Sequence, residues 1–343
     1  MVLELPEELL EEILCRVPTT SLIRLRSTCK QWNSLVNDRR FTRTHFDKAP
    51  KQFTMCMLNN HLFCSMSINL RSFPHVEVTR KFGLNKLHSS LDQIKFCHVF
   101  HCCEGLLLCV TRENHPRLVV WNPCTRQTRW INSYKGYTNT YALGSYQDQK
   151  SPNDNSYKIL SHSGYGENRE FETLEINSNS WRTLDVTLDF KLSVIDCGVS
   201  LKGKTYWITD DEFLVSFDYT SERFERLSCL PRQYTVYETR SLSVVREENL
   251  AVLIQDRVTK KANKIIETKA VSWRMFLAVN SKLNLERYLW ESGRFLVDEE
   301  KKVFVFCDTG SKLCIAGENN HVRQVDSGLT GYLFTYVPSL TQF

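Results

Sequence analysis

The spacing of apolar residues divides the chain into two parts. From Leu5 to about Phe46 they recur every three or four residues, which predicts helices, and this spacing is almost absent afterwards. From about Gln52 onward, short runs alternate apolar and polar residues, are rich in aromatic and β-branched side chains, and are separated by turn-forming residues. The pattern predicts an α + β multidomain chain, with a small helical module at residues 1–48 and an all-β region at residues 49–343.

Three helices are expected in the helical module. The first begins near Pro6, which a first helical turn tolerates, and ends before Pro18. The apolar residues of this helix fall on one stripe: Leu9, Leu10, Ile13, Leu14 and Val17. The next two helices carry Leu22, Leu25 and Cys29, and then Trp32, Leu35 and Val36. Three helices in about forty residues are near the lower size limit of an independent fold, so we expect the module to pack against something else.

Charge is distributed unevenly along this module. Glutamates dominate residues 1–17, whereas arginines and lysines dominate residues 18–48. Two solvated helix faces of opposite sign account for the pattern, and the alternative is a role in steering a partner toward the module.

A recurring unit in the β region predicts a propeller. Each unit has an apolar strand, an Asn or Asp, a polar turn, and an aromatic residue that opens the next strand. The unit occurs at Trp121–Trp130, Ile176–Trp181 and Phe217–Phe224. The turn residues Asn122, Asn177 and Asp218 are 55 and 41 residues apart, close to the roughly 40–50 residues of a propeller blade. We expect about six blades around an axis, with the last strand, near Gly331, pairing with an early strand.

Composition narrows the functional classes. The 44 Lys and Arg against 39 Asp and Glu leave a formal charge of +5 without a basic run, which does not indicate nucleic-acid binding. The N-terminal residues do not resemble a signal peptide, and the apolar runs are far shorter than a membrane helix. The 13 cysteines are odd in number and irregularly spaced, so we interpret them as reduced thiols. A cytoplasmic or nuclear protein without a nucleic-acid or membrane partner is expected.

No catalytic, metal or cofactor site is predicted. Histidines and cysteines gather at Cys97, His98, His101, Cys102 and Cys103. Their spacing differs from that of paired zinc-binding cysteines, and adjacent residues of a strand point to opposite faces, so we interpret the cluster as buried thiols in a strand pair. A nucleophile motif and a glycine-rich phosphate loop are both missing from the sequence.

Two further expectations concern the propeller. Its aromatic residues are expected to pack between blades rather than to line a ligand groove: Trp121, Trp130, Trp181, Trp207, Phe217, Phe224 and Trp273. A surface that selects a target is expected on loops at one face, around residues 146–156, 165–170 and 232–238.

The helical module resembles the F-box. The matching residues, in register, are Leu5, Pro6, Leu9, Leu10, Ile13, Leu14, Val17, Pro18, Ser21, Leu22, Leu25, Cys29 and Trp32. The resemblance implies docking to a Skp-type adaptor, which links an F-box protein to a cullin and a ubiquitin-conjugating enzyme. It implies that the following residues form or support the adaptor-facing surface: Leu5, Pro6, Leu9, Ile13, Leu14, Pro18, Leu22, Leu25, Cys29 and Trp32. Some of these are expected to form the core of the module instead, above all Ile13, Leu25 and Trp32.

The β region is similar to the F-box-associated interaction region of plant F-box proteins, which is kelch-like in its order of strands and turns. The segments that carry the similarity are residues 103–110, 120–131, 198–207, 213–224, 271–279 and 336–340, although the glycine pairs of true kelch blades are missing. The resemblance implies a non-catalytic substrate-recognition subunit of an SCF-type ubiquitin ligase, whose propeller recruits an unidentified target protein for ubiquitination.

Two other functional classes remain open on the sequence. A propeller-type carbohydrate-binding protein or hydrolase with a helical leader needs converging carboxylates, and the tightest acidic group is Asp210, Asp211 and Glu212. A solvated turn explains that group more simply. A DNA reader would use Arg24, Arg26 and Lys30, but the third helix is too short and too apolar for a recognition helix.

Overall fold

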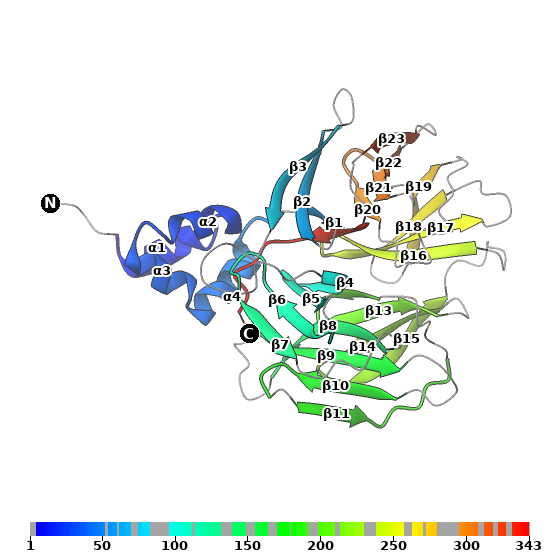
Figure 1. Cartoon of the computed structure of the whole chain (residues 1–343), viewed down its shortest axis with the longest axis horizontal. Helices are drawn as coiled ribbons and strands as arrows, with labels where there is room; N and C mark the ends of the chain where they lie inside the picture. Colours follow the sequence, from blue (N-terminus) through cyan, green and yellow to red (C-terminus); the bar gives the residue numbers. More distant parts are fainter. Residues whose placement is uncertain are drawn as a thin grey trace.

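The computed structural model has a helical module beside a ring of β-sheets (Figure 1). It describes residues 5–51, 54–59, 62–69, 75–82, 96–111, 114–131, 139–148, 155–163, 170–178, 180–190, 192, 198–209, 213–229, 238–256, 263–269, 272–279, 295–307, 312–317, 322–326 and 331–342.

The described residues of the helical module form four helices: α1 (Glu7–Leu14), α2 (Thr19–Leu25), α3 (Lys30–Val36) and α4 (Arg39–Lys48). The first three agree with the helices expected from the sequence. α4 is a separate helix because Asp38 caps its first turn, where the carboxylate accepts a hydrogen bond from the Phe41 N–H at 2.8 Å. The continuous helical pattern up to Phe46 did not reveal this break.

The described strands form six antiparallel sheets of four strands each. In the order of the strands within each sheet, they are β24 (Gly331–Tyr336), β1 (Thr54–Asn59), β2 (Leu62–Asn69) and β3 (His75–Phe82); β4 (Phe96–Cys103), β5 (Leu106–Thr111), β6 (Leu118–Trp121) and β7 (Thr128–Ile131); β8 (Asn139–Gln147), β9 (Asn155–Ser163), β10 (Phe171–Glu175) and β11 (Ser180–Leu184); β12 (Val199–Leu201), β13 (Lys204–Ile208), β14 (Phe213–Asp218) and β15 (Arg223–Cys229); β16 (Glu238–Val245), β17 (Asn249–Asp256), β18 (Asn263–Lys269) and β19 (Ser272–Val279); β20 (Leu296–Asp298), β21 (Val303–Cys307), β22 (Lys312–Gly317) and β23 (Val322–Asp326).

These sheets are the blades of a closed propeller. Contacts between neighbouring blades run around the whole ring: β4 with β8, β8 with β12, β12 with β16, β16 with β20, β21 with β24, and β1 with β4. The last strand, β24, pairs with the first, β1, so that Phe334 lies opposite Cys56. The expectations of about six blades and of closure by the terminal strand are both confirmed. Because the two ends of the β region share a blade, backbone hydrogen bonds between them help to hold the ring closed.

The repeated sequence units occupy equivalent places in three blades. Each connects the third and fourth strands of its blade: β6 with β7, β10 with β11, and β14 with β15. The side chain of the turn residue explains why Asn or Asp recurs there. The Asn122 amide oxygen accepts hydrogen bonds from backbone N–H groups two and three residues later, at 2.8 and 3.3 Å, and the Asp218 carboxylate does the same at 2.9 Å.

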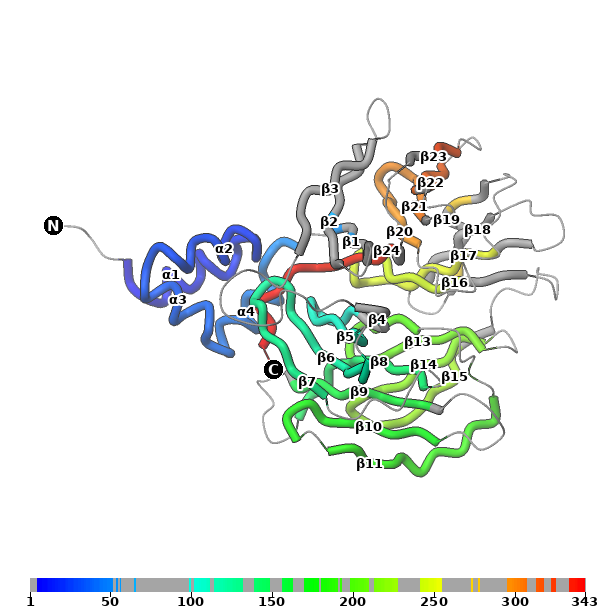
Figure 2. The backbone as a smooth tube through the Cα atoms, in the orientation of Figure 1, coloured from blue at the N-terminus to red at the C-terminus, as the bar shows by residue number. Residues whose placement is uncertain are grey.

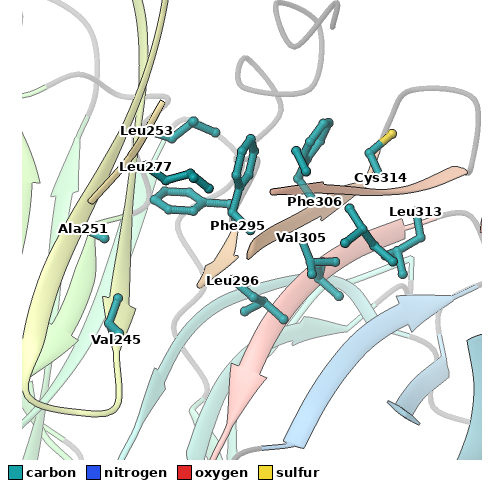
Figure 3. Packing of buried hydrophobic residues seen from close by; sticks show 14 residues of the cluster. Val245, Ala251, Leu253, Leu277, Phe295, Leu296, Val305, Phe306, Leu313 and Cys314 are labelled. Atoms are coloured by element: carbon teal, nitrogen blue, oxygen red, sulfur yellow. The ribbon is translucent and has the colours of Figure 1, made fainter. Parts of the chain in front are cut away.

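Apolar side chains fill the spaces between blades. Figure 3 shows one such cluster, in which Phe295 packs beside Leu253 and Leu277 of the neighbouring blade. Packing is also the role of the aromatic residues singled out in the sequence. Trp121, Trp207 and Phe217 are at most 2% exposed. Partly buried at the edges of such clusters are Trp130, Trp181, Phe224 and Trp273.

Cys102 and Cys103 pack on opposite sides of their sheet, as expected for adjacent strand residues. Cys103 belongs to the cluster around Tyr141, whereas Cys102 packs against the cluster around Trp121. The side chains of Cys97, His98 and His101 lie outside the described residues. Among the residues that the structure does describe, no three His, Cys, Asp or Glu side chains are grouped to hold a metal ion. None of the helices found there has the length and apolar character needed to span a membrane.

Candidate docking surface on the helical module

The outer side of α1 carries an exposed apolar stripe. Leu5, Leu9 and Ile13 are 57%, 53% and 53% exposed. The four-residue spacing of Leu9 and Ile13 places them on one side of α1, one turn apart, and Leu5 lies just before the N-cap of the helix. Within the described part of the chain, Leu227 in the propeller is the one other large apolar side chain that is comparably exposed, at 41%. We refer to Leu5, Leu9 and Ile13 as the α1 stripe.

The inner side of α1 packs into the core of the module. Leu14 and Cys15 are 3% and 1% exposed, and Leu10 and Val17 pack against the same cluster. The other buried members are Leu22, Leu35, Val36, Phe41 and Leu340. The apolar residues of α1 therefore form two adjacent stripes rather than one, and the helix turns only one of them inward.

The ten residues that the F-box resemblance assigned to adaptor docking lie at three depths. Five of them are exposed: Leu5, Pro6, Leu9, Ile13 and Cys29. Pro18, Leu25 and Trp32 are half-buried, and Leu14 and Leu22 are buried. Leu14 and Leu22 lie in the core, where they can support an adaptor-facing surface but do not form it. The assignment of Ile13 to the core is wrong, because it lies on the outward side of α1. Trp32 does pack against the core.

Acidic residues of α1 hold α4 against the helix. The Glu12 carboxylate accepts a hydrogen bond from the Lys48 ammonium group at 2.8 Å, and Arg40 lies 3.4 Å from Glu11. Hydrogen bonds from Lys48 and Arg16 lower the pKa of Glu12. Part of the charge asymmetry in the sequence therefore serves contacts between helices. All these pairs are exposed, so each contributes little to the free energy of folding.

The C-terminal residues of the chain complete the helical module. Figure 2 shows the segment after β24 leaving the propeller and ending beside α4. We call residues 337–342 the tail. Leu340 is 1% exposed and belongs to the core of the helical module. The Thr19 hydroxyl donates a buried hydrogen bond to the Pro338 carbonyl oxygen at 3.0 Å, and the Gln342 amide donates to the Val36 carbonyl at 3.4 Å.

The propeller forms hydrogen bonds with the other side of the tail. The Asn122 amide donates hydrogen bonds to the carbonyl oxygens of Ser339 and Thr341, at 3.2 and 2.9 Å. The Ser339 hydroxyl donates to the Glu104 carbonyl oxygen at 2.6 Å. Asn122 is fully buried, whereas the equivalent Asn177 is exposed. The first of the three repeated turns thus has a second role, which is to tie the helical module to the propeller through the tail.

Replacing Gly105 with alanine is expected to loosen this junction. Gly105 has a φ of +79°, and an added Cβ would lie 2.2 Å from the Ser339 hydroxyl oxygen and 2.8 Å from the Val337 carbonyl oxygen. Left-handed backbone costs alanine roughly 1–2 kcal/mol, and the displaced tail adds to that cost. The G105A variant should lose its helical circular dichroism signal at 222 nm at a lower temperature than the unmodified chain.

Gly203 provides a matched control for this prediction. Its φ is +74°, but a Cβ there would meet only the Ser145 carbonyl oxygen, at 3.3 Å. The G203A variant therefore carries the backbone cost without the clash against the tail. Equal loss of helix stability in the two variants would contradict a special role for the tail.

His45 makes the helical module sensitive to acid. The ring is 1% exposed, and its Nε2 lies 2.8 Å from the Val17 carbonyl oxygen, so the neutral ring donates a hydrogen bond there. Burial lowers the pKa of His45 from its ordinary value of 6.5, and the nearby Lys51 lowers it further. As the pH falls through about 6.5, the His45 ring binds a proton in the unfolded chain but not in the folded chain. The free energy of unfolding therefore falls as the pH drops below that value.

Only one proton, on His45, is involved in this effect, and this sets the upper limit of the change in stability with pH. We expect the free energy of unfolding of the helical module to fall by up to about 1.4 kcal/mol for each pH unit below about 6.5, until the folded pKa is reached. Urea unfolding followed at 222 nm between pH 7.5 and 5 measures this slope. The H45Q variant keeps an N–H donor but has no ionisable ring, so its slope should be smaller. Identical slopes in the two proteins would contradict the assignment.

Most of the loops expected to select a target lie outside the described residues. This applies to residues 149–154, 164–169 and 230–237, and also to the acidic group Asp210, Asp211 and Glu212. The tail contacts, in contrast, join described residues but had no signal in the sequence. Leu340, Asn122 and Ser339 are separated from their partners by more than 200 residues, and no periodic pattern connects them.

Comparison with known proteins gives matches along nearly the whole chain. The family model described as the F-box domain matches residues 2–44, and the model described as the F-box associated beta propeller domain matches residues 54–343. The probable F-box protein At5g47300 of Arabidopsis thaliana is 52% identical over 372 residues, which cover 100% of this chain and 87% of the relative. The putative F-box protein At3g25460 of the same plant is 51% identical over 364 residues, covering 100% of this chain and 98% of the relative. The putative F-box/kelch-repeat protein At1g62270, also from Arabidopsis thaliana, is 43% identical and covers 98% of this chain and 97% of its own length.

Proposed function

Because the chain belongs to the family of plant F-box proteins with an F-box associated β-propeller domain, we propose that it is a substrate-recognition subunit of an SCF-type ubiquitin ligase. In this proposal the helical module at residues 1–48 docks a Skp-type adaptor, which joins it to a cullin. The propeller at residues 49–343 recruits a protein target for ubiquitination.

The observation that carries this proposal is the α1 stripe. Large apolar side chains in water are costly, since burying one of them fully gains about 1.5–3 kcal/mol. Leu9 and Ile13 lie on one side of α1, Leu5 lies just before that helix, and none of the three belongs to the core of the module. A contiguous exposed apolar patch with acidic neighbours favours an interface with another protein.

In this role the chain contributes no catalytic residue. Ubiquitin transfer takes place on the conjugating enzyme, and the chain acts by proximity, which raises the effective concentration of the target near that enzyme. The tail supports such a role because it joins the helical module and the propeller through Thr19, Leu340 and Asn122. A target held on the propeller then has a defined direction relative to the adaptor. We propose the cytoplasm or the nucleus as the place of action.

Affinity purification from plant cells tests the proposal. The tagged full-length chain and its L9D/I13D variant are compared by mass spectrometry of the captured proteins. We expect the adaptor and the cullin to be captured with the unmodified chain and lost with the variant. Proteins captured equally by both forms are bound through the propeller and are candidates for the target.

The L227D variant is the matched control for this comparison. It places one aspartate on the exposed leucine of the propeller, outside the helical module, and should capture the adaptor as well as the unmodified chain does. Capture of the adaptor by L9D/I13D at the unmodified level would contradict the assignment of the α1 stripe as the docking surface.

A further inference from the structure

A cavity of about 320 Å³ lies between the helical module and the propeller axis. On one side it is lined by the end of α4 and the segment after it, with Phe46 and Lys51. On the other side it is lined by the turns between the first and second strands of three blades. Ligand sites favour the junctions between structural units and have volumes of this order.

Charged residues in strained backbone surround this cavity. Glu104, Lys202, Arg246 and Glu247 have φ values of 49°, 49°, 53° and 54°. Tight turns of this kind prefer Gly, Asn and Asp, because other residues in the left-handed region cost roughly 1–3 kcal/mol each. Long charged side chains are therefore held at the mouth of the cavity against the preference of the turns that carry them. Such strain gathers at binding sites more often than elsewhere.

Two of these charged groups are already fully engaged. The Glu104 carboxylate accepts hydrogen bonds from the Ser145 hydroxyl at 2.6 Å and from the Tyr157 hydroxyl at 2.7 Å. The Arg246 guanidinium pairs with Glu299 at 3.1 Å and with Glu300 at 3.2 Å. These groups form the walls of the cavity and have little capacity left for a ligand.

Lys51 and Glu247 retain binding capacity. The Lys51 ammonium group lies 3.8 Å from the Glu247 carboxylate, which is too long for a hydrogen bond, and within the described residues Glu247 has no other partner. Lys51 uses one of its three donors in a 2.6 Å hydrogen bond to the Phe46 carbonyl oxygen, and its ammonium group also lies 3.2 Å from the centre of the Phe46 ring. Burial raises the pKa of Glu247 and lowers that of Lys51. One cation and one anion thus face the same cavity side by side, each with free hydrogen-bonding positions.

A second, smaller cavity continues along the propeller axis. It measures about 80 Å³ and shares Glu104, Arg246 and Glu247 with the first cavity. Its deeper walls are largely apolar, with Val199, Val244, Phe295, Leu296 and Phe334. One water molecule needs about 10–15 Å³ of such a cavity. The smaller cavity therefore holds roughly five water-sized groups, which is enough for an aliphatic side chain.

We propose that the two cavities together bind a free α-amino acid with an apolar side chain. Its ammonium group lies on the Glu247 carboxylate, its carboxylate lies on the Lys51 ammonium group, and its side chain enters the axial cavity. An α-amino acid carries its ammonium and carboxylate groups on the same carbon, which matches a cation and an anion held 3.8 Å apart. The ligand replaces one long ion pair with two hydrogen-bonded ones and displaces water from apolar walls.

Calorimetric titration of the purified full-length chain tests this proposal, and it needs no adaptor, so its result is independent of the proposed function. Leucine is the probe. Each of three analogues lacks one recognised group: glycine lacks the side chain, N-acetylleucine the ammonium group, and isoamylamine the carboxylate. We expect leucine to bind, and each analogue to bind at least tenfold more weakly.

Matched variants separate the site from the rest of the surface. E247Q and K51M should each weaken leucine binding at least tenfold, whereas E225Q and K301M, which make the same changes at exposed residues that line neither cavity, should leave it unchanged. Thermal unfolding without ligand establishes that all four variants are folded. Absence of leucine binding at millimolar concentration would overturn the proposal, and so would equal binding of leucine and N-acetylleucine.

Discussion

The L9D/I13D double substitution is expected to abolish binding to a Skp-type adaptor without unfolding the chain. Both side chains are 53% exposed and lie outside the core of the helical module, so the substitutions should change the free energy of unfolding by no more than about 0.5 kcal/mol each. In the proposed complex, the adaptor would bury both side chains. Loss of two apolar contacts, together with the burial of two unpaired charges, should raise the dissociation constant at least about a hundredfold.

Surface plasmon resonance with the purified adaptor measures this effect. L227D again serves as the control, because it adds one charge at an exposed leucine of the propeller and should leave the affinity unchanged. The temperature at which the helical signal at 222 nm is lost should be the same in all three proteins. An affinity within a factor of three of the unmodified chain would show that the adaptor, if it binds, uses another surface.

The L340A variant is expected to unfold the helical module while the propeller stays folded. Leu340 is 1% exposed in the core of that module, and truncation of a buried leucine to alanine costs about 2–5 kcal/mol. A module of this size has a small core, so a loss of that order is a large part of its stability. The substitution lies about three hundred residues from α2, and its effect on the helices tests whether the tail belongs to their core.

Thiol alkylation with mass spectrometry reads out this effect at a single residue. Cys15 is 1% exposed and packs in the same core, so it should be protected in the unmodified chain and become reactive in L340A. Cys29 is exposed and should react in both proteins. The Q342A variant removes only a 3.4 Å hydrogen bond from the same tail and should keep Cys15 protected. Continued protection of Cys15 in L340A would contradict the proposed completion of the core by the tail.

Local signals in the sequence predicted where helices begin and where the turns between strands lie. Pro6 and Pro18 precede α1 and α2, and the recurring Asn and Asp at residues 122, 177 and 218 identified equivalent turns of three blades. In each case the information lies in residues that are neighbours along the chain, where backbone geometry and capping act directly. The pairing of β24 with β1 was also expected, because a strand pattern at each end of the propeller region needs a partner.

Which side of a helix faces inward was harder to predict. Leu9 and Leu10 are adjacent and both apolar, yet Leu9 is exposed and Leu10 packs against the core. Helical spacing alone allows a wide apolar stripe, and the position of the other helices selects the part that becomes buried. Leu340 illustrates the same limit, because its burial depends on a contact between the two ends of the chain, which no local pattern encodes.

Covalent footprinting of aliphatic side chains tests the central claim most directly, since it reports exposure in the free chain and in the complex. We expect Leu5, Leu9 and Ile13 to be labelled strongly in the free chain and to lose most of that labelling when the adaptor is added. Leu14, Leu22 and Leu340 should be labelled weakly in both states, and Leu227 equally in both. Labelling of the α1 stripe that is unchanged by a bound adaptor would contradict the account.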